Sequence, residues 1–266
     1  MTDSIRTERR GPITAVTIDR PAQRNALDVP AMRLLKQTLQ RIHLDRGVRA
    51  VILTGAGGAF SAGGDVVTMA EFEHRGELPQ LFHELTGEME HAIREIVTMP
   101  KPVLAALPGV AAGGGLSLAL ACDWRIASEK ALLVPAFSRL GAVPDGGLTY
   151  FLPHYLGIGA AQELLLFDSR ITAARARDLT LVHEVVPADK LEARMWERAD
   201  ELSRGPTLAW GSVKRLMISA FGQSLEAQMS LERKAAVEAA QGPELAEGIR
   251  AFREKREPRF GGTQTA

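Results

Sequence analysis

Residues 101–123, KPVLAALPGVAAGGGLSLALACD, decide the fold of this 266-residue chain. The run carries no charge between its ends, and its length would suffice for a membrane-spanning helix. Pro108 and the glycines at 113–115 interrupt it, so two buried elements joined by a glycine turn fit it better. We expect a strand over residues 102–107, a turn over 109–115 and a short helix, buried on all sides, over 116–121.

The rest of the chain alternates strands with helices before Pro144 and is mostly helical after it. Runs of Val, Ile and Leu beside turn residues predict strands, and apolar residues at helical spacing predict amphipathic helices. Strands are expected at residues 5–9, 13–19, 48–53, 124–127, 132–134 and 182–186, and helices at 30–45, over 66–98 and throughout 203–266. The predicted fold class is therefore α/β, with a core over residues 1–202 and a helical oligomerisation region over 203–266.

The charge balance and the cysteine count exclude several classes of protein. The chain has 32 basic and 32 acidic residues, so its net charge does not favour nucleic acid or a membrane surface as a partner. The single cysteine, Cys122, rules out a disulfide within the chain and a four-thiolate zinc site, and the six histidines show no metal-binding spacing. The polar N-terminus lacks the apolar core of a signal peptide. We therefore expect a cytoplasmic protein without a metal.

Two glycine-rich loops offer backbone N–H groups to a ligand. The first, GAGGAFSAGGD at residues 55–65, follows a predicted strand, and the second precedes the helix predicted at 116–121. The first N–H groups of a helix have no partner inside it and can therefore bind a ligand. Two such donors that converge on one carbonyl oxygen form an oxyanion hole. Taken singly, the first loop also fits a ligand-free turn, and the second also fits close helix packing. A dinucleotide site would need a glycine where Phe60 stands.

Six motifs along nearly the whole chain carry a resemblance to a known family. They are RPAQRNAL (20–27), GAGGAFSAGGDV (55–66), KPVLAALPGVAAGGGLSLALACD (101–123), LGAVPDGG (140–147), LVHEVVP (181–187) and AFREKREPRF (251–260). In this order they resemble the crotonase family, the enoyl-CoA hydratase/isomerase superfamily. The sequence VPD followed by two glycines is similar to the phenylacetate-pathway isomerases of that family in particular.

The resemblance implies a fold and a chemistry. Members form a spiral of repeated ββα units followed by a helical trimerisation region, and they act on acyl-CoA thioesters. Two backbone N–H groups stabilise the thioester enolate, and by motif position these belong to Ala62 and Gly114. The implied assembly is a homotrimer or a dimer of trimers. CoA enters only as part of the substrate, so no cofactor is expected.

The resemblance also implies which residues contact the substrate. Arg24 and the loop from Ala62 to Asp65 would lie along the CoA, and Phe252 and Lys255 would contact the CoA of a neighbouring subunit. The expected substrate-binding residues are Arg24, Ser61, Gly63, Gly64, Asp65, Gly113, Ser117, Phe137, Leu148, Phe252 and Lys255.

Two departures from the family pattern bear on the reaction. Hydratases of the family hold one water between two glutamates, and these positions are Ser117 and Phe137 here. Neither a hydroxyl nor a phenyl ring is a useful base near neutral pH. Asp145 remains, at a place where several isomerase branches carry their base. We expect Asp145 to take a proton from one carbon and return it at another, as an enoyl-CoA isomerase requires.

Other roles stay open for these residues. Burial beside Phe137 and Leu148 would raise the pKa of Asp145 above its usual value of about 3.9, but Pro-Asp-Gly is also an ordinary turn sequence. Aryl-CoA dehalogenases of the family use an aspartate here as a nucleophile, with tryptophan where Phe137 stands. The other hypotheses are a hydratase with relocated acid/base groups, including an acid from residues 66–98, and a non-catalytic acyl-CoA-binding protein.

Overall fold

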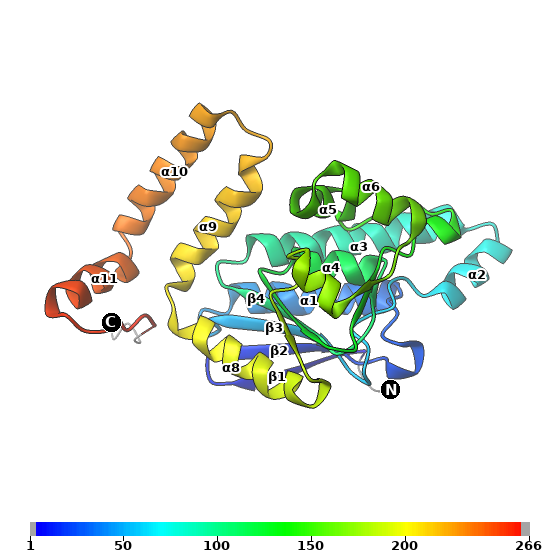
Figure 1. Ribbon diagram of the computed structural model, residues 1–266, viewed down its shortest axis with the longest axis horizontal. Helices are drawn as coiled ribbons and strands as arrows, with labels where there is room; N and C mark the ends of the chain where they lie inside the picture. Colours follow the sequence, from blue (N-terminus) through cyan, green and yellow to red (C-terminus); the bar gives the residue numbers. More distant parts are fainter. Residues whose placement is uncertain (1–3, 262–266) are drawn as a thin grey trace.

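The computed structural model of the chain describes residues 4–261 and is built on a six-stranded sheet (Figure 1). The strand order is β1-β2-β3-β4-β6-β9, in which β1 is antiparallel to β2 and the other neighbours are parallel. These strands are β1 (Ile5–Arg10), β2 (Ile13–Ile18), β3 (Ala50–Gly55), β4 (Val103–Leu107), β6 (Trp124–Ser128) and β9 (Glu184–Val186). Because neighbouring parallel strands end at the same edge of a sheet, the loops after β3 and β4 start side by side.

A second, three-stranded sheet takes one strand from each of two successive units. Its order is β5-β7-β8, and β5 is parallel to β7 just as β4 is parallel to β6 in the large sheet. The further elements of these two units are β5 (Ala111–Ala112), α4 (Gly114–Ala121), β7 (Leu132–Val134) and α5 (Leu148–Leu156). After them follow α6 (Ile158–Phe167), β8 (Ile171–Thr172) and α7 (Ala173–Asp178). The segments β4-β5-α4 and β6-β7-α5 therefore repeat one ββα arrangement along the chain.

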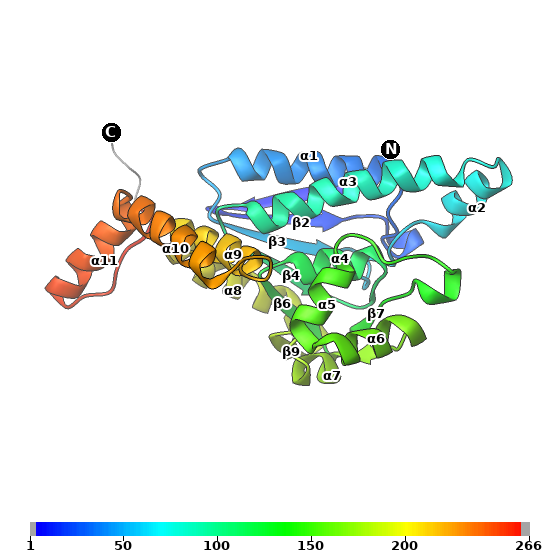
Figure 2. The same ribbon diagram turned by 90° about the horizontal axis from the view of Figure 1, so that it is seen from above.

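Helices cover both faces of the large sheet (Figure 2). α1 (Val29–Leu44) and α3 (Leu78–Thr98) belong to the apolar core on one face, and α8 (Leu191–Arg204) packs on the other. The apolar stripe of α3 points into that core, with Leu81, Leu85, Met89 and Ile93 all buried. Strands buried on both faces are typically continuous apolar runs, which explains the sequences of β3 and β4.

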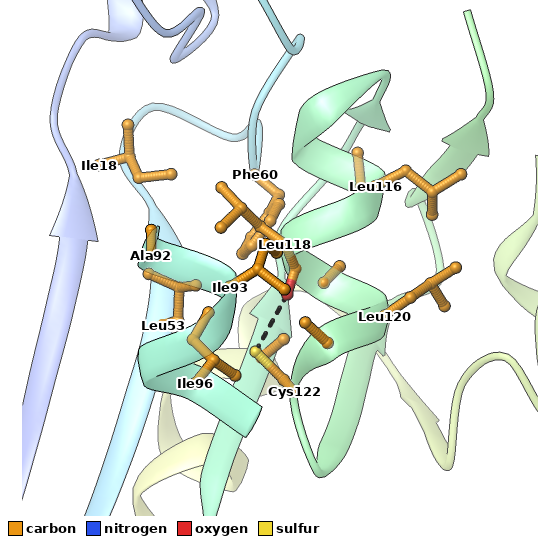
Figure 3. Close-up of a cluster of buried hydrophobic side chains, with 14 of the residues drawn as sticks. Ile18, Leu53, Phe60, Ala92, Ile93, Ile96, Leu116, Leu118, Leu120 and Cys122 are labelled. Atoms are coloured by element: carbon orange, nitrogen blue, oxygen red, sulfur yellow. Dashed lines mark hydrogen bonds between the residues drawn. The ribbon is translucent and has the colours of Figure 1, made fainter. Parts of the chain in front are cut away.

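The helix α4 lies in the middle of the core, where all eight of its residues are buried. Figure 3 shows Ile93 and Ile96 of α3 beside Leu118 of α4. Cys122, directly after α4, donates its thiol hydrogen to the carbonyl of Leu118 at 3.3 Å. Cys122 is a buried core residue, as the sequence predicts. Its burial raises the pKa of the thiol to about 12.

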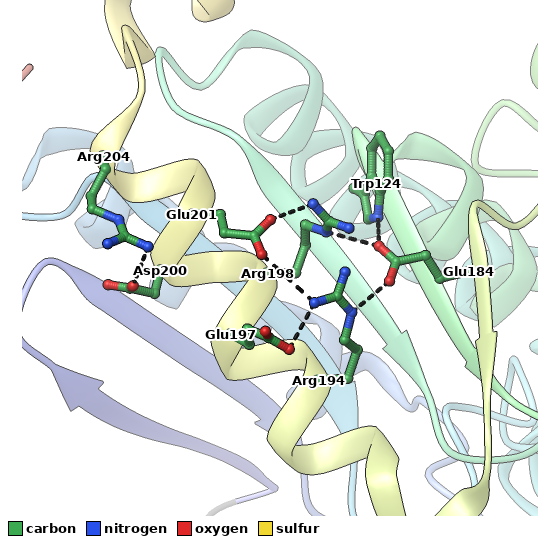
Figure 4. Close-up of polar contacts among 8 residues, drawn as sticks. All are labelled: Trp124, Glu184, Arg194, Glu197, Arg198, Asp200, Glu201 and Arg204. Carbon is green, nitrogen blue, oxygen red and sulfur yellow. Dashed lines mark hydrogen bonds and ion pairs between the residues drawn. The ribbon is translucent and has the colours of Figure 1, made fainter. Parts of the chain in front are cut away.

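Glu184 of β9 fastens α8 to the sheet (Figure 4). Its carboxylate accepts hydrogen bonds from Arg194 Nε at 2.6 Å, Arg198 Nε at 2.8 Å and Trp124 Nε1 at 3.0 Å. Burial alone would raise the pKa of Glu184, but these hydrogen bonds hold it below its usual value. The ionised carboxylate therefore ties α8 to two neighbouring strands, β9 and β6.

Three helices, α9 (Thr207–Ala220), α10 (Leu225–Ala240) and α11 (Pro243–Glu254), extend from the sheet as an arm (Figure 1). α10 has no buried residue, and its Leu225 side chain is 70% exposed. Exposed apolar surface of this kind is typical of contacts with another protein chain. The predicted trimer stays a prediction. The predicted boundary between residues 202 and 203 also stays a prediction. It falls inside α8 (Leu191–Arg204).

The structure differs from the sequence expectations at several element boundaries. α4 begins at Gly114, two residues before the expected helix, and the expected turn at 109–115 contains β5. Residues 66–98, which are expected to be helical, form two helices, α2 (Val66–His74) and α3. The strands expected at 48–53 and 182–186 each start two residues later. No helix within residues 4–261 is long and apolar enough to cross a membrane.

Candidate active site

The two glycine-rich loops meet at the carboxyl ends of β3 and β4. The N–H groups of Phe60 and Ser61 donate to the carbonyl of Val110 at 2.9 and 3.1 Å, and Ala112 N–H donates to the carbonyl of Ser61 at 2.9 Å. Phe60 is fully buried in the core and anchors the first loop there (Figure 3). The loops singled out by the sequence thus come together where open α/β sheets bind their ligands.

Gly64 and Gly114 are among the glycines of these loops whose backbone N–H groups have no acceptor within residues 4–261, and both line the cavity described below. Leu27 N–H donates to the carbonyl of Gly63 at 2.7 Å, and the Leu27 carbonyl accepts from Asp65 N–H at 3.1 Å. Gly64 lies between these two bonds, so its own N–H points away from Leu27. Gly114 is the first residue of α4, where N–H groups lack partners inside the helix.

Ala62 does not fit the donor role that its motif position implied. Its N–H donates to the carbonyl of Arg24 at 3.0 Å and is therefore already used. Gly64, in the same loop, lines the same cavity as Ala62 and Gly114. A β-carbon on Gly63 would lie 3.3 Å from the nitrogen of Gly114, so this loop passes directly over the start of α4. The candidate pair of donors is corrected to Gly64 and Gly114.

A cavity of about 580 Å³ opens beside these donors. Its walls are largely apolar and come mainly from α2, α3, the two loops and residues 134–145. The predicted site residues that line it are Ala62, Gly64, Gly113, Gly114, Phe137 and Asp145. An apolar cavity with a few convergent polar groups is typical of a small-molecule site.

The carboxyl group of Asp145 reaches this cavity close to Gly114. A β-carbon on Gly114 would lie 3.6 Å from Asp145 Oδ1. That oxygen is buried, and it has no hydrogen-bond partner in the part of the chain that the structure describes. Burial raises the pKa of Asp145 to about 6, which makes its carboxylate a stronger base than an exposed one. The arrangement places a base beside a free backbone donor.

Ser117 and Leu148 hold the turn that carries Asp145 and do not line the cavity. The Oγ of Ser117, which is fully buried, donates to the backbone carbonyl of Asp145 at 2.8 Å. Leu148 N–H donates to the same carbonyl at 3.1 Å, and its side chain is part of the core. Each residue holds the backbone of Asp145, and the expectation that either contacts the substrate stays a prediction.

Three other residues that are predicted to contact the substrate support the first loop and do not line the cavity. Ser61 Oγ is buried, donates to the carbonyl of Asn25 at 2.8 Å and accepts from Gly63 N–H at 3.1 Å. Asp65 caps the N-terminus of α2 and pairs with Arg20 at 3.2 Å. Ser61, Gly63 and Asp65 therefore support the donor loop instead of lining the cavity.

Arg24, Phe252 and Lys255, which are also predicted to contact CoA, lie outside the cavity lining. Arg24 is exposed beside the first loop. Phe252 on α11 is 86% exposed, and Lys255 ends that helix. α11 and α2 lie at opposite ends of the molecule in both views (Figures 1 and 2). The contact of Phe252 and Lys255 with a neighbouring subunit stays a prediction.

Sequence reasoning missed Asp168, which fixes one wall of the cavity. Its carboxylate is buried and accepts from the N–H groups of Phe137 at 3.1 Å and Arg139 at 2.8 Å. These bonds hold the Phe137 ring, whose Cζ would lie 3.9 Å from a β-carbon on Gly113. The partners of Asp168 lie 31 and 29 residues away in the sequence, so no local pattern could indicate this role.

The burial of Asp145 predicts the pH dependence of any proton transfer it performs. The active base is the carboxylate, so kcat/KM should rise with pH up to about 6 and level off above it. Well below that pH it should fall about tenfold per unit, because the protonated carboxyl is no longer a base. Initial rates between about pH 4.5 and 8, with folding checked by circular dichroism, measure this profile. A flat profile would contradict the assignment of Asp145 as base.

Comparisons with known proteins cover nearly the whole chain. The enoyl-CoA hydratase/isomerase family model matches residues 8–263. A probable enoyl-CoA hydratase of Rhodobacter capsulatus is 38% identical over 260 residues, which cover 97% of this chain and 98% of that protein. The 1,2-epoxyphenylacetyl-CoA isomerase of Escherichia coli is 33% identical over 250 residues, which cover 94% of this chain and 95% of that protein.

Solved structures show the same fold. The crystal structure of an enoyl-CoA hydratase from Polaromonas sp. JS666 has a TM-score of 0.90 at 34% identity, covering 96% of this chain and 98% of the other. Likeness over this length confirms the predicted α/β spiral of ββα units with C-terminal helices. The relatives are named as a probable hydratase and as an isomerase, so the names do not decide the reaction.

Proposed function

This chain belongs to the enoyl-CoA hydratase/isomerase family, and from that membership we propose that it is an enoyl-CoA isomerase in which Asp145 moves a proton. In the proposed complex, the thioester carbonyl oxygen accepts hydrogen bonds from the N–H groups of Gly64 and Gly114. The observation that carries the proposal is the buried Oδ1 of Asp145, which lies beside the Gly114 donor without a partner among the described residues. A base next to an oxyanion site is what enolate formation and reprotonation require.

The proposed reaction needs one base and one oxyanion site. The carboxylate of Asp145 removes a proton from the α carbon of a 3-enoyl thioester, and the electron pair moves onto the carbonyl oxygen as a dienolate. The N–H groups of Gly64 and Gly114 stabilise that negative charge. The protonated carboxyl then returns the proton to the γ carbon, which gives the 2-enoyl thioester with no net change in protons. A pKa of about 6 suits a group that must both accept and release a proton.

Hydration is the second candidate, because a relative that is 38% identical over 97% of this chain is named a probable enoyl-CoA hydratase. The two glutamate positions of the family hold Ser117, whose Oγ already donates to a carbonyl, and Phe137. The cavity lining also includes the acids Glu73 and Asp168, and the carboxylate of Asp168 is bound by two N–H groups. Glu73, exposed on α2, is therefore the acid that a relocated hydratase mechanism would use.

Exchange with solvent deuterium tests the proposal. The protein is incubated in D2O with short 2- and 3-enoyl-CoA esters, and mass spectrometry and NMR identify the product and locate the deuterium. We expect a shifted double bond together with deuterium at the α or γ carbon. Formation of 3-hydroxyacyl-CoA without a shift would favour the hydratase. Tight binding of the esters without any exchange would favour a non-catalytic acyl-CoA-binding protein, and either result overturns the proposal.

A further inference from the structure

The side chain of Met89 fills the space between the Gly114 donor and the turn that carries Asp145. Met89 lies on α3, is 4% exposed and lines the cavity. A β-carbon on Gly114 would lie 2.6 Å from Met89 Cε, and the same point is 3.6 Å from Asp145 Oδ1. A β-carbon on Gly146, the next residue after Asp145, would lie 3.3 Å from Met89 Cγ. The thioether therefore runs from the start of α4 to the Asp145 turn.

This placement puts an apolar side chain where a water molecule would find polar partners. A bound water needs two or more hydrogen-bond partners, and Asp145 Oδ1 and Gly114 N–H are both without one among residues 4–261. The Met89 side chain lies against Gly114 and Gly146, the two glycines next to these groups. We propose that Met89 is a specificity-determining residue that keeps water away from Asp145 and so commits the site to proton transfer instead of hydration. The inference rests on the proposed function and deepens it.

Shortening Met89 would let the same carboxylate act on water. Asp145 would take one proton from the water while the water oxygen bonds to the β carbon of a 2-enoyl thioester, and the enolate would form at the oxyanion site. The carboxyl would then give that proton to the α carbon. One water adds across the double bond, and the carboxylate is regenerated. Removal of the three atoms beyond Cβ frees the volume of about one or two waters.

Met69 offers a matched control beside the other proposed donor, Gly64, in the same cavity lining. A β-carbon on Gly64, the other donor, would lie 2.4 Å from Met69 Cε and 3.7 Å from Leu85 Cδ2, with no further atom within 4 Å. Met69→Ala therefore removes the same atoms from the same cavity, next to Gly64 instead of Gly114. Met89→Leu keeps an apolar side chain of similar volume beside Asp145 and is the second control.

The experiment compares wild-type protein with Met89→Ala, Met89→Leu and Met69→Ala, and it has two readouts. The first is the ratio of 3-hydroxyacyl-CoA to shifted enoyl-CoA formed from a 2-enoyl-CoA ester in H2(18)O. The second is the titration of the Asp145 carboxyl, followed by carbon-13 NMR in the absence of substrate. Met89→Val, which keeps more of the core contact, replaces Met89→Ala if the alanine variant does not fold.

We expect Met89→Ala to raise the hydration ratio at least about tenfold, with labelled oxygen in the product, and to lower the carboxyl titration midpoint by about one unit. Met89→Leu and Met69→Ala should leave both readouts near those of wild type. An unchanged ratio and midpoint in folded Met89→Ala, or an equal change in Met69→Ala, would overturn the inference. If wild type shifts no double bond, the proposed function fails, and the titration alone then decides whether Met89 excludes water.

Discussion

Replacement of Asp145 with asparagine is expected to lower the rates of double-bond shift and deuterium exchange by about 100- to 10,000-fold. The amide has nearly the size of the carboxyl group but cannot take a proton from carbon. The donors at Gly64 and Gly114 and the apolar cavity are retained, so the binding of an acyl-CoA ester should change far less than turnover. Steady-state kinetics and a separate binding titration with the same ester measure the two effects.

Two further measurements distinguish the loss of a base from damage to the site. Any residual activity of Asp145→Asn should lose the rise toward pH 6, because the group that titrates there is gone. Glu84→Gln is the matched carboxylate-to-amide control, since Glu84 pairs with Arg33 and does not line the cavity. If Asp145→Asn stayed within about threefold of wild type and kept its pH profile, the base would have to be another group.

Much of the fold follows from patterns that are local in the sequence. The apolar spacing of Leu81, Leu85, Met89 and Ile93 predicts which face of α3 is buried. The run at 102–122, which carries no charge, predicts both β4 and the fully buried α4. β5 and β8 escape this reasoning because two residues are too few to show a period, and their pairing with β7 depends on the tertiary fold.

The candidate site could be predicted at the level of loops and less well at the level of single atoms. Glycine content indicates that the loop at 55–65 exposes N–H groups, but which of them is free depends on distant acceptors. Ala62 N–H is used by the carbonyl of Arg24, whereas Gly64 N–H is not used by any described residue. Leu148 shows the same limit, because hydrophobicity predicts burial without saying whether a side chain faces the core or the cavity.

Replacement of Gly114 with proline should give the second large effect, because proline removes the N–H group that we assign to the oxyanion. Loss of one oxyanion donor lowers kcat by about 100- to 1,000-fold in enzymes of comparable design. Gly114 is the first residue of α4, a position where proline fits the helix and where no intrahelical bond is lost. Kinetics should therefore change strongly while the thermal unfolding midpoint changes little.

The alanine variant of Gly114 separates the donor from the space around it. In both variants a β-carbon would lie 2.6 Å from Met89 Cε, the flexible end of that side chain, so both displace Met89. Only the proline variant lacks the N–H and places its ring Cδ where that hydrogen pointed, so the difference in kcat between the two reports on the donor position. Equal losses in the two variants would mean that crowding at Met89 causes the effect and that the enolate oxygen is held elsewhere. A much larger loss in the proline variant would place the developing negative charge at the N-terminus of α4, where the backbone dipoles of a helix also favour it.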